Sequence, residues 1–239
     1  MNKKKNVNKR LGIIGGMGPE TSSKFYLELI ERSRKFCDSN PSIIMDSVPI
    51  PFSLEEEIIQ KSENVHKFLP ILKESIERLN KIEVDLVVIP CNTVHIFIDD
   101  LRKESDVPII SIIEETLRKV KEEGLKNVGL LATKKTIESK LYENPMRKNR
   151  INVILSTVVE QNDISRIIIE ILGNKAKNNS KKILERIIKN LIKRGSEAII
   201  LGCTDLQIIL DTDEFEVELL DSMKILAEST FQRLVDFER

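Results

Sequence analysis

The chain has 239 residues, of which 41% are hydrophobic and 32% are charged, and its formal net charge at pH 7 is +0. This length suits one large domain or two small ones, and the composition is that of an ordinary soluble globular protein. A neutral chain offers no electrostatic reason to bind nucleic acid or an anionic membrane, and no apolar run reaches the roughly 20 residues of a spanning helix. The three cysteines lack the spacing of a disulfide framework or a structural zinc site, which indicates a reducing, cytoplasmic setting.

The N-terminal region predicts a strand, a glycine-rich turn and a helix. An aliphatic run after Lys9 leads into Gly15-Gly-Met-Gly-Pro19, and Pro19 suits the first turn of a helix that runs to about residue 35. Such a turn brings the backbone close to whatever occupies the end of the strand. A dinucleotide-binding turn needs a third glycine where this chain has Thr21, and the GKS or GKT of a phosphate-binding loop does not follow. The turn therefore does not indicate nucleotide binding.

Strand and helix signals alternate through the rest of the first half. The expected strands cover residues 42–48, 85–89 and 107–110, and the expected helices cover residues 54–60, 65–81, 93–104 and 112–123. An irregular loop at residues 49–53 follows the first of these strands, and Gly124 ends the last of these helices.

The second half repeats features of the first half. A strand and turn at residues 126–133 resemble the opening of the chain at a distance of 117 residues, counted from Lys9 to Lys126. A cysteine that follows a buried strand recurs 112 residues after Cys91, at Cys203. Two motifs that recur at nearly one spacing indicate an internal duplication. The remaining expected strands are residues 151–155, the run before Cys203 and residues 216–220, and the remaining expected helices are residues 164–172, 180–194 and 222–237.

This alternation predicts an α/β protein with two pseudo-symmetric domains, each a parallel-type β-sheet flanked by helices. We expect the first domain to comprise residues 1–110 plus 216–239, and the second to comprise residues 111–215. The last helix is assigned to the first domain because that half otherwise has one helix fewer. Ligands of parallel sheets bind at the carboxyl ends of the strands, so we expect the turns of both halves to meet in an interdomain cleft.

The motif that carries chemistry is Asp85-Leu-Val-Val-Ile-Pro-Cys91-Asn-Thr93, and its second copy is Glu197-Ala-Ile-Ile-Leu-Gly-Cys203-Thr204. Each copy is an acidic residue, a buried strand, a turn-forming proline or glycine, and then cysteine and threonine. We expect a helix to start after each cysteine, with Thr93 or Thr204 as its cap. The amides and dipole of such a helix start would lower the pKa of the thiol. A lone cysteine is usually a small buried hydrophobe, but two in matching contexts favour a function.

Two thiols on opposite sides of one carbon atom can invert that carbon without a metal or a cofactor. One, as thiolate, removes a proton while the other, as thiol, delivers a proton to the opposite face. The pair must be unequally protonated, which coupled neighbouring groups provide. The adjacent carboxylate also needs hydrogen-bond donors to hold the charge of the enolate, and Asn92, Thr93 and Thr204 are placed for this role.

Other polar residues leave alternatives open. His95 is either a proton relay to Cys91 or a histidine with structural partners, and Asp205 either tunes a thiol, orients a donor or caps the following helix. Cys37 ends a helix outside any motif and is expected to be incidental. The two histidines show no HxH or HExxH spacing, so no catalytic metal is expected.

Four motifs in order resemble the aspartate racemases of the aspartate/glutamate racemase superfamily: Gly15-Gly-Met-Gly-Pro19, Pro90-Cys-Asn-Thr93 with His95, Gly129-Leu-Leu-Ala-Thr133 with Thr136, and Leu201-Gly-Cys-Thr204. The resemblance extends from about residue 10 to about residue 230 and so covers nearly the whole chain. It implies a cofactor-independent amino-acid racemase, commonly a homodimer, whose substrate is aspartate. It also implies that Cys91 and Cys203 are the two acid/base residues, and that the substrate is held by Met17, Asn92, Thr93, Thr133 and Thr204.

The chain departs from the family pattern at two places. Asp205 stands where the second cysteine motif usually continues with glutamate. No arginine occurs between Arg34 and Arg78, although many aspartate racemases carry one in the loop after the second strand, where it binds the side-chain carboxylate of the substrate. Lys175 is the candidate for that role here. A lysine lacks the bidentate geometry of arginine, which favours weaker rejection of glutamate and other amino acids.

Two other functions stay open at this point. A related isomerase or decarboxylase of small dicarboxylates would share the fold, but such relatives often lack one cysteine of the pair. The presence of both Cys91 and Cys203 therefore favours racemisation. A redox or ligand sensor would instead form a reversible disulfide between these two residues.

Overall fold

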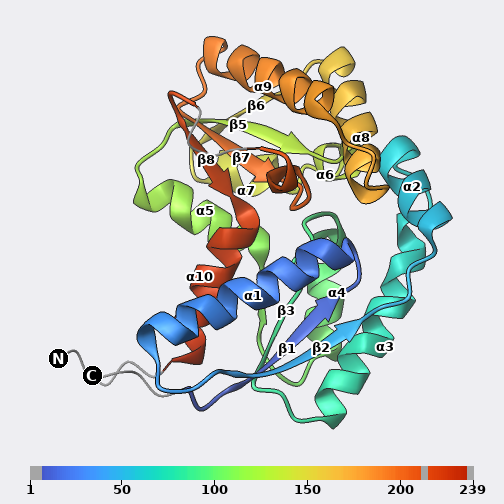
Figure 1. Ribbon diagram of the computed structural model, residues 1–239, viewed down its shortest axis with the longest axis vertical. Helices are drawn as coiled ribbons and strands as arrows, with labels where there is room; N and C mark the ends of the chain where they lie inside the picture. The colour runs from blue at the N-terminus through green and yellow to red at the C-terminus, as the bar shows by residue number, and fades with distance from the viewer. Residues whose placement is uncertain (1–6, 211–214, 236–239) are drawn as a thin grey trace. The chain divides into compact units, whose positions relative to one another are not determined.

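A computed structural model describes residues 7–210 and 215–235 (Figure 1). Within these residues the chain forms two four-stranded sheets, with the strand orders β2-β1-β3-β4 and β6-β5-β7-β8. All neighbouring strands are parallel, which confirms the predicted α/β class. The strands are β1 (Arg10–Gly15), β2 (Ser42–Ser47), β3 (Leu86–Val88), β4 (Ile109–Ile110), β5 (Asn127–Ala132), β6 (Asn152–Leu155), β7 (Ala198–Gly202) and β8 (Glu218–Asp221).

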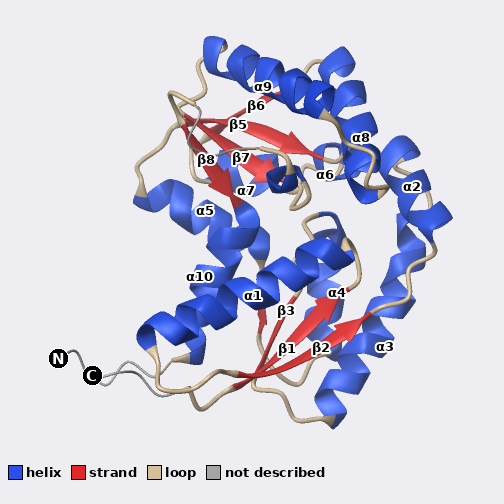
Figure 2. Cartoon of the chain, viewed as in Figure 1, coloured by secondary structure: helices blue, strands red, loops and turns tan. Residues whose placement is uncertain are grey.

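Helices connect the strands (Figure 2). In the first half these are α1 (Pro19–Phe36), α2 (Phe52–Lys61), α3 (Phe68–Lys81), α4 (Ile98–Glu104) and α5 (Ile112–Glu122), with the 3₁₀ turns η1 (Val65–Lys67) and η2 (Thr93–Phe97). In the second half they are α6 (Lys134–Glu138), α7 (Glu143–Lys148), α8 (Val158–Leu172), α9 (Asn178–Lys193) and α10 (Ser222–Leu234), with the 3₁₀ turn η3 (Leu206–Ile208). The predicted end of the last helix, at residue 237, lies outside the described residues. None of the described helices is long and apolar enough to cross a membrane.

Helices pack on both faces of the first sheet, which explains why strand β1 is apolar after its first residue, Arg10. Strand β1 is buried at every residue except its first. A Cβ atom built on Gly12 would lie 2.9 Å from the side chain of Leu79 in α3. One built on Gly15 would lie 2.9 Å from Oγ of Ser22 in α1. Because alternate residues of a strand face opposite sides, α1 and α3 cover opposite faces of this sheet.

The second sheet is enclosed in the same way. Strand β7 is buried along its whole length. A Cβ atom on Gly129 of β5 would lie 3.3 Å from Leu191 of α9, whereas one on Gly202 of β7 would lie 3.2 Å from the ring of Tyr142. The core between the sheet and the helices α8 and α9 is almost entirely aliphatic and includes Ile164, Ile167, Ile168, Leu184, Ile187, Ile188 and Leu191. Burial on both faces accounts for the continuous apolar runs that predicted these strands.

The acidic residue that opens each copy of the cysteine motif has the same role in both sheets. The carboxylate of Asp85 accepts a hydrogen bond from the backbone N–H of Arg10 at 2.6 Å. The carboxylate of Glu197 accepts from the N–H groups of Lys126 and Asn127 at 2.6 and 2.7 Å, and these bonds lower its pKa. Each acid therefore ties the start of the third strand of its sheet to the start of the first. This match and the common strand order support the internal duplication.

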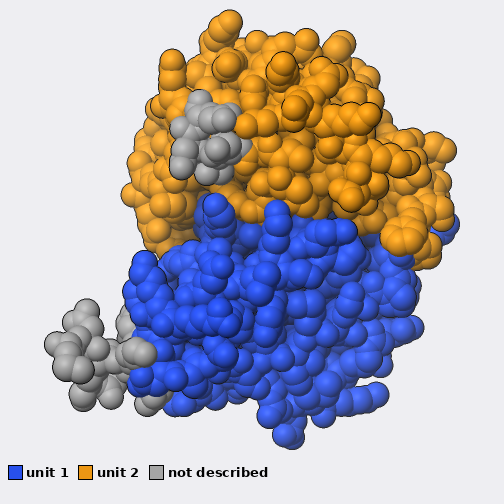
Figure 3. All heavy atoms as spheres, in the orientation of Figure 1, with its two compact units in different colours: residues 1–50, 66–115, 223–239 blue, residues 51–65, 116–222 orange. Residues whose placement is uncertain are grey.

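The chain divides into two compact units (Figure 3). Unit 1 comprises residues 1–50, 66–115 and 223–239, and unit 2 comprises residues 51–65 and 116–222. Helix α10 is therefore part of unit 1. Arg233 of α10 pairs with the buried Glu115 of α5 at 2.5 Å, and the rings of Phe231 and Phe36 lie 6.0 Å apart.

Helix α2 belongs to unit 2, although it follows β2 in the chain. It contacts α6 and α8, and its Ile59 is part of the apolar core that contains Leu184 and Cys203. The expected division into domains at residues 110 and 216 stays a prediction.

Local signals explain where the helix predictions were wrong. Helix α8 begins at Val158, six residues before the predicted start at Ile164, because Thr157 and Glu160 form a capping box. The N–H of Glu160 donates to Oγ1 of Thr157 at 3.3 Å, and the N–H of Thr157 donates to Oε2 of Glu160 at 2.8 Å. Helices α6 and α7 lie in a stretch for which the sequence predicts no helix, because elements of five and six residues carry little periodicity.

The expected helix caps after the two cysteines are also wrong. Each cysteine is followed by a 3₁₀ turn, in which Asn92 and Asp205 occupy the cap positions and neither side chain forms a capping bond. Thr93 and Thr204 are therefore not the caps. A 3₁₀ turn as short as η3 has little dipole, so the expected lowering of the pKa by an α-helix start lacks its physical cause at Cys203.

Candidate active site

The glycine turn of unit 1 depends on a close contact between backbone segments. Gly16 has a φ of +91°, and a Cβ atom there would lie 2.5 Å from the carbonyl oxygen of Val48. The hydroxyl of Ser22 accepts from the N–H of Gly16 and donates to the carbonyl of Gly18, both at 3.1 Å. Met17, at the tip of the turn, is only 5% exposed. Ser22 is thus a positioning residue that sequence reasoning missed, and its place in the first turn of α1 was the available signal.

The first cysteine motif lies at the end of the neighbouring strand. Strand β3 pairs with β1, so the segment after β3 and the glycine turn leave the sheet at the same edge. The N–H of Cys91 donates to the carbonyl of Ile89 at 2.8 Å, which bends the chain sharply after the strand. Cys91 is partly exposed, whereas Asn92 and Thr93 are buried. Unit 1 therefore brings Met17, Cys91, Asn92 and Thr93 to one edge of its sheet.

The ring of His95 supports this turn by hydrogen bonding to backbone groups. Its Nδ1 lies 2.8 Å from the carbonyl oxygen of Cys91, and the N–H of Ile112 donates to its Nε2 at 3.3 Å. Because Nε2 accepts a bond, the proton of the neutral ring belongs on Nδ1, from which it is donated to Cys91. Burial lowers the pKa of His95 to about 4. Both nitrogens are occupied by backbone groups, so the proton-relay interpretation is wrong and His95 is a positioning residue.

The burial of His95 predicts a loss of stability in mild acid. The unfolded chain binds a proton near the ordinary histidine pKa of 6.5, whereas the folded chain does so only near 4. The contribution of His95 to stability is therefore fully present above pH 6.5. About 3 kcal/mol of the free energy of unfolding is expected to be lost as the pH falls from 6.5 towards 4. Urea unfolding at a series of pH values measures this loss.

Substitution of each histidine isolates its contribution to the pH dependence. His95→Gln should be less stable at neutral pH and should have a flatter pH profile between 6.5 and 4. His66 is exposed and serves as the matched control, so His66→Gln should keep the wild-type profile. An unchanged slope in His95→Gln would contradict the assignment.

Unit 2 presents a threonine at the end of its first strand. Thr133 caps α6, since its Oγ1 accepts from the N–H of Thr136 at 3.2 Å and lies 3.0 Å from the hydroxyl oxygen of Thr136. The side-chain amide of Gln161 donates to the carbonyl of Ala132 at 3.0 Å and so holds the end of β5. Thr133 is 5% exposed. Gln161 was not anticipated from the sequence, because it reaches this strand from α8.

The second cysteine motif lies at the end of β7, which pairs with β5. The thiol of Cys203 donates to Oδ2 of Asp205 at 3.7 Å, and both residues are buried, as is Thr204. Of the roles left open for Asp205, contact with a thiol is observed, whereas capping is not. Unit 2 brings Thr133, Cys203 and Thr204 to one edge of its sheet.

A buried tyrosine supports β7, the strand that precedes Cys203. Tyr142 is fully buried, and its hydroxyl forms hydrogen bonds with Thr116 and Ser222. Burial raises the pKa of this phenol. The hydroxyl of Ser222 in turn donates to the carbonyl of Leu201 at 2.7 Å. This network was not predicted, because its members lie far apart in the sequence.

Lys175 lies in the turn between α8 and α9. Its side chain is exposed, and its backbone N–H donates to the carbonyl of Glu170 at 2.6 Å. The described residues contain no group of three or more His, Cys, Asp or Glu side chains that could hold a metal ion.

Comparison with known proteins gives consistent results. The sequence model of the Asp/Glu/hydantoin racemase family matches residues 14–230. The broad specificity amino-acid racemase RacX of Bacillus subtilis (strain 168) is 26% identical over 233 residues, which cover 95% of this chain and 99% of RacX. An aspartate racemase homologue from Pyrococcus horikoshii OT3 is 29% identical with a TM-score of 0.78, over 95% of this chain and 99% of its own. The aspartate racemase of Picrophilus torridus has the same fold, with a TM-score of 0.80 at 24% identity over 97% of this chain and 96% of its own.

Proposed function

The chain belongs to the Asp/Glu/hydantoin racemase family, and we propose that it inverts the Cα atom of free amino acids without a cofactor, using Cys91 and Cys203. The observation that carries this proposal is the matched placement of the two cysteines. Strands β3 and β7 hold the same position in their sheets, and each is followed by a turn that presents a thiol. A duplicated fold that carries one thiol in each half supports proton transfer to and from two faces of a carbon atom.

In the proposed reaction, one thiolate takes the proton from Cα. The electron pair of the broken C–H bond moves into the adjacent carboxyl group and forms an enolate. The thiol on the other side then gives its proton to the opposite face of the planar carbon. The product is the mirror-image amino acid, and the two sulfur atoms have exchanged protonation states. No electrons are gained or lost, so the reaction needs no oxidant or reductant.

The enolate needs donors fixed before the reaction starts, because groups that reorient during it contribute less. Asn92 and Thr93 of unit 1 and Thr133 and Thr204 of unit 2 are each at most 7% exposed and lie beside or near the strand ends. We assign them to the substrate carboxylate, with Met17 contributing contact at the glycine turn. Burial strengthens their hydrogen bonds to charge, since competing water is excluded.

Asp205 gives the two thiols different surroundings. Its carboxylate accepts from Cys203, which favours the thiol form there over the thiolate. Cys91 is partly exposed and its turn is held by a neutral histidine. In this proposal the resting enzyme carries a thiol at Cys203 and has Cys91 as the base. The unequal protonation that two-sided transfer requires is thereby present before the substrate binds.

The proposed substrate range includes aspartate and extends beyond it. The loop at residues 49–53 contains no arginine, and Lys175, the candidate in its place, is an exposed lysine. A lysine binds a carboxylate as a point charge and discriminates chain length less sharply than a bidentate guanidinium. The similarity to a relative named as a broad-specificity racemase supports this wider substrate range.

A screen of free amino acids for deuterium uptake at Cα tests this proposal. We expect exchange and racemisation of aspartate together with several other amino acids. Lys175→Ala should raise the KM of aspartate more than that of a neutral amino acid, and Lys182→Ala, an exposed lysine on α9, should change neither. Turnover of neutral amino acids alone would remove aspartate from the range, and no exchange with any amino acid would refute racemisation.

A further inference from the structure

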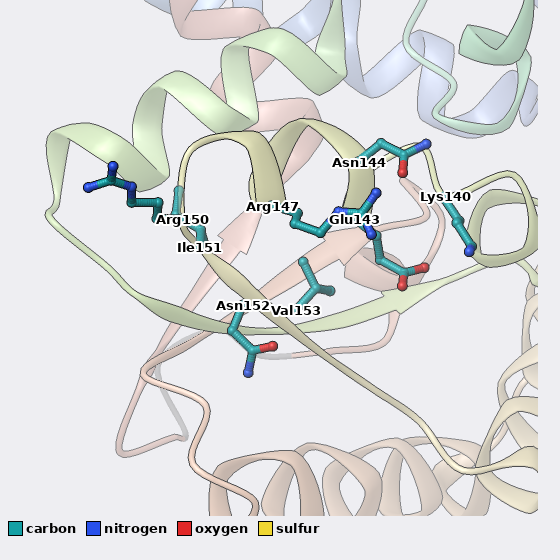
Figure 4. A pocket seen from close by; sticks show the side chains of 8 residues that line it. All are labelled: Lys140, Glu143, Asn144, Arg147, Arg150, Ile151, Asn152 and Val153. Atoms are coloured by element: carbon teal, nitrogen blue, oxygen red, sulfur yellow. The ribbon is translucent and has the colours of Figure 1, made fainter.

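Unit 2 contains a pocket of ≈ 330 Å³ that involves none of the residues assigned to racemisation. It lies between the turn before α7, the exposed side of α7 and the start of β6 (Figure 4). Its charged lining residues are three cations, Lys140, Arg147 and Arg150, and one carboxylate, Glu143. A pocket of this size holds a small molecule, since ligand sites commonly enclose about 300–1,000 Å³.

Among the described residues, Lys140 and Arg147 lack the acidic partner that some other cations of unit 2, such as Arg166, have. On α8, Arg166 pairs with Glu170 at 2.7 Å across one helical turn. Glu143 and Arg147 have the same spacing on α7, yet no ion pair forms between them. Within residues 7–210 and 215–235, neither Lys140 nor Arg147 has an acidic partner within ion-pair distance. Both side chains are exposed and available to a ligand.

The arrangement of the side chains favours a ligand that has both an anionic group and an apolar part. Figure 4 shows Lys140, Glu143 and Arg147 toward one end of the pocket, and the side chain of Arg150 at the other end, pointing away from them. The half-buried Val153 of β6 supplies an apolar wall between them. A guanidinium and an ammonium group that line one pocket are suited to phosphate, because arginine binds its oxygens in pairs and lysine adds a point charge.

Two of the pocket's cations lie in the turns before and after α7. Lys140 and Arg150 both have left-handed backbone conformations, with φ of 53° and 59°. Glycine is the residue that adopts this conformation without strain, and Gly195 does so in the turn before β7. From the pocket, its unpaired cations and its apolar wall, we propose that it binds a small phosphate-bearing molecule.

Isothermal titration of the full chain with phenyl phosphate and with inorganic phosphate tests this site. We expect saturable binding at one site per chain that weakens as salt is added. Arg147→Gln should weaken binding about tenfold, because a charge-assisted bidentate contact is lost. Glu143→Gln should tighten it, because the only carboxylate of the lining is removed. Tighter binding of phenyl phosphate would assign the site to a phosphate ester, and equal binding would assign it to free phosphate.

The matched control removes exposed cations of unit 2 outside the pocket. Lys182→Gln combined with Lys189→Gln on α9 changes the net charge more than Arg147→Gln does, but should leave binding unchanged. Circular dichroism of each variant verifies folding, and the opposite effect expected of Glu143→Gln is a result that misfolding does not produce. Absence of saturable binding, or equal weakening in the control, would overturn the proposal. Racemisation is measured separately, so failure here leaves the proposed function untouched.

Discussion

Replacement of either Cys91 or Cys203 with serine is expected to lower racemisation by about 10²–10⁴-fold, because a positioned acid or base is lost. A serine hydroxyl keeps nearly the same shape but gives up its proton far less readily than a thiol. Each variant should still bind the substrate, since the donors assigned to the carboxylate are unchanged. Asp205→Asn should have a smaller effect, because the thiol remains and only its protonation is altered.

Cys37 provides the matched control for this experiment. Like Cys203 it is buried, but it lies at the end of α1 outside both motifs. Cys37→Ser should keep racemisation near the wild-type rate, as measured by polarimetry or by chiral separation of the products. Near-wild-type racemisation in either Cys91→Ser or Cys203→Ser would exclude the two-thiol mechanism. Equal losses in all three variants would point to a folding defect instead.

Gly16→Ala is expected to destabilise unit 1 by about 2–4 kcal/mol, because strain and a steric clash act together. The φ of +91° disfavours any residue with a Cβ atom, and that atom would lie 2.5 Å from the carbonyl oxygen of Val48. The turn must move to relieve this contact. Such a movement would displace Met17 and also disturb the bond between Gly16 and Ser22. Racemisation should therefore fall along with stability.

Gly195→Ala distinguishes the cost of backbone strain from the cost of the steric clash with Val48. Gly195 has a similar φ of +96°, but a Cβ atom there would have nothing within 4 Å. Its substitution should cost only about 1 kcal/mol, from backbone strain alone, with racemisation unchanged. Urea unfolding of both variants measures the difference. If the two substitutions have equal cost, the contact with Val48 does not constrain the turn.

The sequence was sufficient for features that depend on neighbouring residues and on repetition. Continuous apolar runs predicted parallel strands, because burial on both faces removes the polar alternation. The matching positions of Cys91 and Cys203 predicted the duplication, and the common strand order of the two sheets agrees with it. The start of α8 was also encoded locally, in the capping box of Thr157 and Glu160, although periodicity alone placed it too late.

The tertiary structure decided what depends on residues that are distant in the chain. The role of His95 follows from the N–H of Ile112, 17 residues away, which occupies the nitrogen that a proton relay would need. Helix α2 joins unit 2 because Ile59 buries its apolar side chain in the core of that unit. Short-range patterns report which face of an element is apolar, but not which surface covers it. That choice is made by packing, since apolar burial is non-directional and several surfaces compete for each helix.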